Sequence, residues 1–283
     1  MLLIIEALLL ILAALGQDHR ASVKGQIIPL DMAEKSVDDK YGECTKKMAD
    51  LVETKLLQAE LKASSVFKLA WDKGKDFAKG PKDDLKRNHL IAIHVYSDAS
   101  VYKDFNPDTR SGKKKYIDKE YKWYSLHFLL TEAIQILKKT QNQCYSTFRG
   151  TKDTFNKNVL NKEVRFGSFA SSSLDIKVAK YFGTKSCFEI YTCEGADMTK
   201  YSKLPHEKEV LIPPYEKFKV TAVKTKDEQK DLWCETVFVL KTTGTRSDLN
   251  CALFKKRSKK PSKKPSKKPS KTKTKYYALN KGH

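Results

Sequence analysis

The segment Leu204-Pro205-His206-Glu207-Lys208-Glu209-Val210-Leu211-Ile212-Pro213-Pro214 places two carboxylates two residues apart, directly before an apolar run that two prolines close. In an extended segment, side chains at positions i and i+2 project to the same side. We therefore predict that Glu207 and Glu209 face one cleft and that Lys208 points away from it. Two like charges in one place are typical of a site that meets a cation. A solvated loop is the alternative interpretation of the same three residues.

The residues around this segment predict short strands, and the residues before it predict helices. We expect strands at residues 144–148, 164–171, 187–193, 209–212, 218–223 and 235–240, and one short helix near residues 175–182. Apolar residues recur at helical spacing within 32–79 and 124–139. Between these helices, the β-branched run at 88–96 predicts a strand. Helices early and strands late indicate an α+β fold.

The two ends of the chain differ in composition from its middle. Residues 2–15 are apolar apart from Glu6 and are short for a bilayer span, so they predict a secretory signal peptide within residues 1–16, with an uncleaved anchor as the alternative. After Asn250 there are thirteen Lys or Arg residues and no acid, in a chain of net charge +21. The Ser-Lys-Lys-Pro repeat there predicts a disordered basic tail over residues 255–283. We expect one domain at 17–254, secreted, monomeric and without a transmembrane span.

The cysteines and histidines are the residues that could ligate a metal such as zinc. Six cysteines form an even set, which in an oxidising compartment predicts disulfides. They contain no Cys-x-x-Cys pair, and the six histidines form no local cluster with them, so we expect no metal site. His127 lies in the regular helix at 124–139, and we interpret it as a packed residue and not as a general base.

Two further segments carry groups that suit a ligand containing sugar and phosphate. Phe148-Arg149-Gly150-Thr151 places an arginine at a strand end beside a glycine, which allows close backbone approach to a ligand. The segment Arg165-Phe166-Gly167-Ser168-Phe169-Ala170-Ser171-Ser172-Ser173 presents hydroxyls that can bond ribose or amide groups, although a serine run is also typical of a plain strand end. An arginine, a serine and a glutamate on three strands could bind one such ligand.

This order of residues resembles the arginine-specific ecto-ADP-ribosyltransferases of vertebrates, which carry an Arg, Ser, Glu-x-Glu signature. Residues 126–137 resemble the family's leucine-threonine-alanine helix, and 191–196 and 209–214 resemble its later blocks, so that the similarity covers roughly residues 31–254. The resemblance implies an N-terminal helical region packed on a two-sheet β core with an NAD cleft and no metal. It also implies transfer of one ADP-ribose from NAD to arginine side chains of extracellular proteins.

The resemblance implies a role for each residue of the signature. Arg149, with the backbone of Gly150, would hold the nicotinamide end of NAD. Ser171 would bond the nicotinamide ribose or position the glutamate. Glu209 would bond the ribose 2'-hydroxyl and stabilise the positive charge at the anomeric carbon as nicotinamide leaves. Glu207 would receive the acceptor arginine, orient it and take its proton.

Two more residues are candidates for contacts with NAD. Phe182 is expected to stack on the nicotinamide ring, with a place in the core as the alternative. Arg165 is expected to contact the pyrophosphate, because a fixed guanidinium suits phosphate oxygens. No Gly-x-Gly-x-x-Gly follows a strand, so a Rossmann-type NAD site is not expected.

The resemblance also selects disulfide pairs and leaves alternatives for the function. It pairs Cys44 with Cys251 and Cys144 with Cys193, and we add a third bridge between Cys187 and Cys234. An NAD glycohydrolase, with water as the acceptor, is one alternative. A secreted protein that binds heparan sulfate or other polyanions through Lys255 to Lys275 is another.

Overall fold

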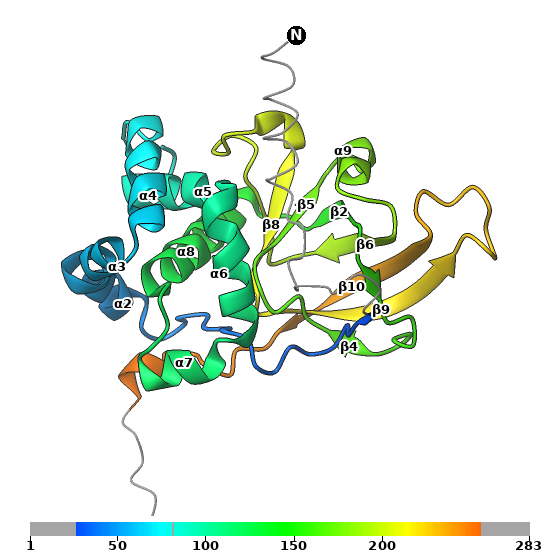
Figure 1. The fold of residues 1–283 in the computed structure, drawn as a ribbon, viewed down its shortest axis with the longest axis horizontal. Coiled ribbons are helices and arrows are strands. Elements are labelled where there is room, and N and C mark those ends of the chain that lie inside the picture. The colour runs from blue at the N-terminus through cyan, green and yellow to red at the C-terminus, as the bar shows by residue number, and fades with distance from the viewer. Residues whose placement is uncertain (1–26, 81, 256–283) are drawn as a thin grey trace, which may run out of the picture.

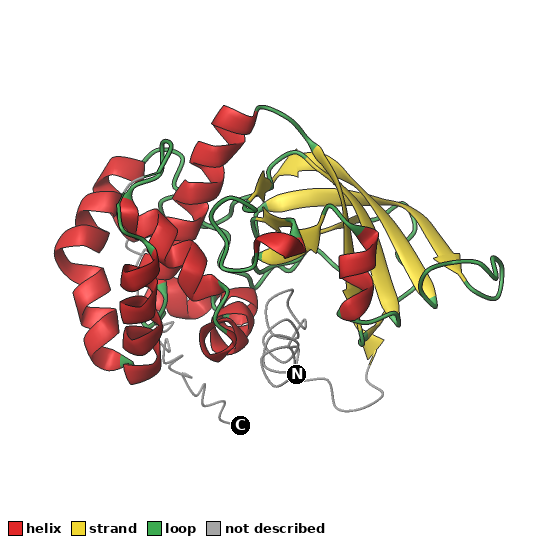
Figure 2. Cartoon of the chain, turned by 90° about the horizontal axis from the view of Figure 1, so that it is seen from above, coloured by secondary structure: helices red, strands yellow, loops and turns green. Residues whose placement is uncertain are grey.

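The computed structural model describes residues 27–80 and 82–255, so the predicted signal peptide and all of the basic tail beyond Lys255 lie outside the described residues. A helical region and a β region lie side by side (Figures 1 and 2). The helices of the first region are α2 (Thr45–Leu51), α3 (Leu57–Ala63), α4 (Ser65–Phe77), α5 (Arg87–Tyr96), α6 (Ala99–Ser111), α7 (Lys113–Asp118) and α8 (Tyr124–Gln141), with a π-helical turn at Val52–Leu56. The α+β class is confirmed.

The helix predicted at 32–79 is wrong in its extent. It begins only at Thr45, and Ser64 interrupts it with an extended backbone (φ −135°, ψ 110°). The hydroxyl of Ser64 accepts a hydrogen bond from the backbone N–H of Phe67 at 3.2 Å, which caps α4 and allows the chain to change direction. The helix predicted at 124–139 is confirmed as α8, which ends where Asn142 adopts a left-handed conformation (φ 43°).

The strand predicted at 88–96 is also wrong, because these residues form α5. All side chains from His89 to Tyr96 are buried, and α5 packs against α4, α6 and α8. A helix buried on every side has no polar face, so its sequence carries no helical period. The β-branched residues then suggested a strand that the packing does not allow.

Ten strands of the described residues make up the β region. They are β1 (Ile27–Ile28), β2 (Tyr145–Thr151), β3 (Thr154–Phe155), β4 (Glu163–Val164), β5 (Ala170–Ser173), β6 (Ser186–Thr192), β7 (Ala196–Asp197), β8 (Glu209–Ile212), β9 (Glu216–Thr225) and β10 (Thr236–Thr245). The short helix near 175–182 is confirmed as α9 (Ile176–Tyr181). The strand predicted at 164–171 is divided into β4 and β5, because Gly167 turns the chain between them with a positive φ of 72°.

The β region is divided between strands β2 and β5. Strands β1 and β3 form a parallel pair, and the other eight follow the order β4-β9-β10-β6-β2-β5-β8-β7. Strands β2 and β5 share a single residue pair, Phe148 with Ser173, whereas β5 and β8 share four. The eight-stranded sheet is therefore two sheets joined by one pair, and this agrees with the two-sheet core that was expected.

Three disulfides tie distant segments together as expected. Cys44 is bonded to Cys251, Cys144 to Cys193 and Cys187 to Cys234, with Cα–Cα distances of 5.8, 4.2 and 6.0 Å. Closing loops of this length stabilises a fold by roughly 3 to 5 kcal/mol per bridge, since it restricts the unfolded chain. Across the described part of the chain, no helix has the length and apolarity needed to span a membrane.

Candidate active site

Three neighbouring strands bring Arg149, Ser171 and Glu209 to the division in the sheet. Arg149 lies on β2, and its Nη1 donates a hydrogen bond to the backbone carbonyl of Ser171 on β5 at 2.7 Å. Strand β8 pairs with β5 so that Glu209 lies opposite Ser173. All three signature side chains are buried, at 7%, 1% and 4% exposure. The structure therefore brings together residues that are up to 60 positions apart in sequence.

The two glutamates meet in a different way from the one predicted. Glu207 is the last residue of a 3₁₀ helix (Pro205–Glu207), and Lys208 has a left-handed backbone (φ 48°), so the two glutamates do not belong to one extended strand. The Ser173 hydroxyl donates to the Glu207 carbonyl at 2.7 Å and holds this turn beside β5. Glu207 is 1% exposed, and the charge of Glu209 acts on it. The expectation that both carboxylates meet in one place survives, although the extended geometry does not.

The two carboxylates have fewer partners than buried acids normally have. Glu207 Oε1, Glu207 Oε2 and Glu209 Oε1 are buried without a hydrogen bond. Burial, with the charge of Glu209, raises the pKa of Glu207 to about 8. Burial also raises the pKa of Glu209 to about 7, although Ser171 and Arg149 offset part of this effect. Since unpartnered buried acids are costly and rare, this pair is a candidate for binding a cation.

The helical region supplies four further residues that sequence reasoning missed. Tyr96 on α5 donates to the Phe169 carbonyl at 3.1 Å and accepts from Asn106 Nδ2 at 3.3 Å. Burial raises the pKa of Tyr102 to about 12, and the charges of Arg149 and Glu207 also act on it. The spacing of Tyr102, Asn106 and Arg110 along α6 is a signal that could have found them, because residues four apart share a helix face.

Arg110 and Arg149 lie at the same small cavity. Both line a space of about 10 Å³, together with Asn106 and Ala170. Arg110 Nη2 also donates to the Ser168 hydroxyl at 2.8 Å, so a serine from the predicted segment 165–173 orients the arginine from α6. This space has room for only about one water molecule, but two neighbouring guanidiniums are suited to an anionic group such as a phosphate.

The structure gives Arg165 a role other than the predicted pyrophosphate contact. Its guanidinium is fully buried, bonds Asp38 Oδ2 at 2.6 Å, and donates to the carbonyls of Met32, Ala33 and Arg246. A guanidinium surrounded in this way has no side left for a ligand. The prediction is wrong because sequence alone does not show which acid reaches a buried arginine.

Phe182 and Gly150 both lie at the C-terminal end of α9. Phe182 is 4% exposed and forms the C-cap of α9, which favours its place in the core over stacking on a ligand. A Cβ atom on Gly150 would lie 2.3 Å from the Gly183 carbonyl oxygen and 2.4 Å from that of Ala179. Glycine is therefore needed at 150 for α9 to pack on β2.

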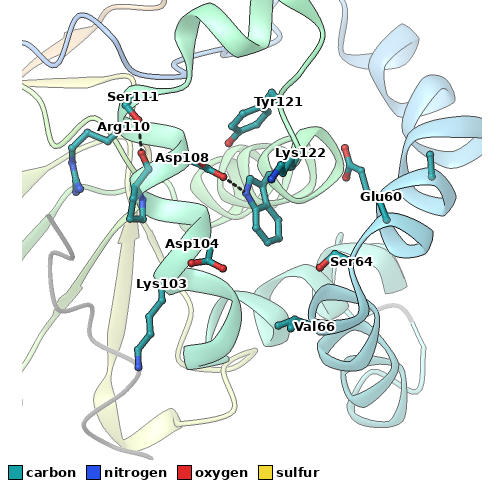
Figure 3. Close-up of a pocket in the computed structure, with 14 residues that line it drawn as sticks. Glu60, Ser64, Val66, Lys103, Asp104, Asp108, Arg110, Ser111, Tyr121 and Lys122 are labelled. Carbon is teal, nitrogen blue, oxygen red and sulfur yellow. Dashed lines mark hydrogen bonds between the residues drawn. The ribbon is translucent and has the colours of Figure 1, made fainter. Parts of the chain in front are cut away.

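A wider crevice lies in the helical region and has different chemistry (Figure 3). It has a volume of about 1090 Å³ and lies between α3, α4, α6 and the Tyr121–Trp123 segment. Two acids in its wall are partnered: Glu60 accepts from the Ser125 N–H at 3.1 Å, and Asp108 accepts from Trp123 Nε1 at 2.9 Å. The crevice contains none of the residues that were predicted for the site. The unpartnered glutamate pair is therefore the better candidate for catalysis.

Comparison with known proteins agrees with this geometry. The profile of the NAD:arginine ADP-ribosyltransferase family matches residues 30–236. The chain belongs to this family. It is 35% identical to the NAD(P)(+)–arginine ADP-ribosyltransferase 2 of Gallus gallus over 81% of this chain and 74% of that protein. It is 31% identical to the ecto-ADP-ribosyltransferase 5 of Homo sapiens over 88% of both chains.

A solved structure shares the fold of this family member. A mutant of the eukaryotic mono-ADP-ribosyltransferase ART2.2 in complex with NADH superposes with a TM-score of 0.67 at 30% identity, covering 79% of this chain and 98% of that chain. Within residues 27–80 and 82–255, no group of three or more His, Cys, Asp or Glu side chains is placed to hold a metal.

Proposed function

We propose that this protein transfers a single ADP-ribose from NAD to arginine side chains of extracellular proteins and releases nicotinamide. The observation that supports this most strongly is the buried, unpartnered pair Glu207 and Glu209 beside Arg149. Nicotinamide departure leaves positive charge on the ribose, and the acceptor guanidinium is itself a cation. Two adjacent carboxylates match two cationic groups.

In this mechanism Glu209 acts on NAD. Its ionised carboxylate bonds the ribose 2'-hydroxyl and stabilises the charge that develops at the anomeric carbon as the bond to nicotinamide breaks. Nicotinamide leaves as a neutral molecule from a cationic state, so this step needs no general acid. Ser171 adjoins Glu209 and positions it, and Arg149 with the Gly150 backbone holds the nicotinamide end.

Glu207 acts on the acceptor. A free guanidinium is a poor nucleophile, because its pKa lies above about 12. Glu207 orients the arginine, and the bond from a guanidinium nitrogen to the anomeric carbon forms as the proton passes to the carboxylate. Glu207 accepts the proton in its ionised form, and its raised pKa, about 8, makes it a stronger base than an ordinary carboxylate.

Arg110 takes the role that was first assigned to Arg165. It lies with Arg149 at the cavity beside Ala170, and it donates hydrogen bonds to the Phe166 carbonyl and the Ser168 hydroxyl. We propose that Arg110 contacts the phosphates of NAD, because a guanidinium can bond two oxygens of one phosphate. An Arg110→Lys variant keeps the charge but loses the paired geometry, so its KM for NAD should rise about tenfold.

The decisive experiment is incubation with labelled NAD and agmatine, a small guanidine. Labelled ADP-ribosyl agmatine supports the proposal. Free labelled ADP-ribose alone identifies an NAD glycohydrolase, and unchanged NAD identifies a binding protein. Each outcome is distinct, so the single assay separates the three functions.

The location and the basic tail complete the proposal. A human relative of this chain is named as an ecto-enzyme, and the apolar residues 2–15 support secretion. The tail has thirteen Lys or Arg residues and no acid after Asn250, which supports binding of heparan sulfate or another polyanion by Lys255 to Lys275. Retention on heparin should fall when the chain is ended at Phe254. Equal retention of the two forms would contradict a role for the tail.

A further inference from the structure

Four exposed lysines lie on α4, on α9 and in the segment that leads to Glu209, and we call them the lysine rim. They are Lys73 on α4, Lys177 on α9, and Lys203 and Lys208 in the segment before β8. The backbone N–H of Leu174, just before α9, donates to the Lys208 carbonyl at 3.1 Å, so these two segments meet directly beside Glu207. Figure 1 shows α9 and the segment before β8 at the same end of the sheet.

One half of the rim surrounds Asp175. Lys208 Nζ lies 3.1 Å from Asp175 Oδ2, and the Lys208 side chain is still 53% exposed. The backbone N–H of Lys177 donates to Asp175 Oδ1 at 2.9 Å, and the positive charge of its side chain also acts on Asp175. The backbone of Lys177 and the side chain of Lys208 lower the pKa of Asp175. One acid therefore adjoins two lysines.

The other half of the rim surrounds the junction of α5 and α6. Burial lowers the pKa of His94 on α5, and the charges of Lys203 and Lys73 lower it further. The same two lysines act on Asp98, which caps α6 by accepting from the Ser100 N–H at 2.9 Å. Tyr102 lies one turn further along α6, and the charge of Glu207 contributes to raising its pKa. The charge of Glu207 therefore reaches α6, the helix whose first turn also feels the charges of Lys73 and Lys203.

The rim is positively charged, whereas the floor of the site is formed by two acids that carry negative charge when they are ionised. Four lysines outnumber the two acids that adjoin them, whereas the buried floor consists of Glu207 and Glu209. At physiological salt, charges interact over about 8 Å, so the rim acts on the acceptor surface around the arginine as well as on the arginine itself. A lone cation is repelled by the rim and attracted by the floor. An arginine within an acidic surface is attracted by both.

We propose that the lysine rim selects acceptor arginines that are flanked by acidic residues on the partner protein. The proposal rests on the transferase function proposed above and names the class of acceptor. Opposite charges around a docking site raise the rate of encounter and discourage partners of the wrong sign. The rim thereby excludes arginines in basic surroundings, which the glutamate floor alone would accept.

The test compares two peptides that each contain one arginine, flanked by Asp or Glu in the first and by Lys in the second. With wild-type protein and labelled NAD, kcat/KM should be about tenfold higher for the acidic peptide at low salt, and the ratio should approach one at about 0.5 M NaCl. The variant Lys177→Glu with Lys203→Glu should invert the ratio. A matched control, Lys226→Glu with Lys230→Glu in the turn between β9 and β10, should keep it.

Agmatine separates failure of the inference from failure of the proposed function. Agmatine has no flanking residues and is itself a cation, so the rim variant should modify it at least as fast as the wild type does, which also shows that the variant is folded. If wild-type protein modifies agmatine but treats both peptides alike, the inference is overturned and the transferase function stands. If the rim variant loses only heparin retention and keeps the peptide ratio, the rim is a polyanion site and the inference is equally overturned. If agmatine is not modified at all, the proposed function itself is wrong.

Discussion

Within the described residues, two pairs of buried acids lie close together in sequence, and they differ in their partners. Asp38 accepts from Arg165 and from the N–H groups of Asp248 and Leu249. Asp39 accepts from the N–H groups of Tyr41 and Cys251 and from the Tyr116 hydroxyl. By contrast, three of the four carboxylate oxygens of Glu207 and Glu209 have no partner. Depth of burial does not distinguish the pairs, since Asp38 and Asp39 are fully buried and the glutamates nearly so.

The comparison shows how a structural acid differs from a functional one in this fold. Asp38 and Asp39 join the start of the described chain to its end, near the Cys44–Cys251 bridge, and their hydrogen bonds offset part of the cost of burial, although burial still raises the pKa of Asp39 to about 6. Glu207 and Glu209 retain unused bonding capacity. A cationic group of the substrate can supply the hydrogen bonds that these glutamates lack within the protein. The variants below test this difference between the two pairs of acids.

The largest expected effect is on catalysis at Glu209. The variant Glu209→Gln keeps the shape but removes the charge, so kcat for nicotinamide release should fall by at least about 10³-fold. Rates with labelled NAD measure this. The matched change in the other pair, Asp39→Asn, should reduce thermal stability and leave the activity of the folded protein within about threefold. An active Glu209→Gln enzyme would refute the assignment of the site.

Breaking the partnered pair should cost stability instead of activity. Arg165→Ala leaves Asp38 buried without its cation, so the free energy of unfolding should fall by about 3 to 5 kcal/mol. Urea unfolding measures the change. Arg246→Ala is the control: its side chain is 36% exposed in its pair with Asp248, so its loss should cost less than about 1 kcal/mol. Similar losses for both variants would show that burial of the Arg165 pair does not matter.

Glu207 should affect the choice of acceptor. In Glu207→Gln the arginine is no longer oriented or deprotonated, so transfer to agmatine should fall by about 10²-fold. Hydrolysis of NAD should remain within about threefold, since Glu209 is retained. The ratio of ADP-ribosyl agmatine to free ADP-ribose measures the effect. A parallel loss of both products would mean that Glu207 acts on NAD as well.

The unpartnered pair should also make stability depend on pH. The folded pKa of Glu207, about 8, lies above its ordinary value of 4.5, so the folded state binds more protons between these values. The stabilisation that protonated Glu207 contributes is therefore complete below about pH 4.5 and is lost as the pH rises through about 8. Glu207→Gln should remove this loss and be more stable than wild type by on the order of 2 kcal/mol at pH 9, with little difference near pH 4. Urea unfolding at both pH values measures it, and a constant difference would contradict the raised pKa.

Much of the site could be predicted because its signals are local. Strand β8 has the same bounds, residues 209–212, in the prediction and in the structure, since an apolar run closed by two prolines leaves little choice. Helix α8 was equally clear from its period. The failures share a cause. Residues 88–96 and Glu207 depend on what packs around them, and the left-handed Lys208 is not visible in a Glu-Lys-Glu sequence.

Arg149 and Arg165 show where the sequence stops being informative. Both are arginines beside Gly-containing segments, and both are buried. The order of Arg149, Ser171 and Glu209 along the chain was enough to indicate the family and the chemistry, because matching blocks in order are local patterns. Only the tertiary structure decided that Asp38 forms an ion pair with Arg165 and that Arg110 on α6 lines the same cavity as Arg149. The physical reason is that a side chain's role follows from which charges and donors reach it, and chain folding brings these from distant positions, 127 residues away for Asp38 and Arg165.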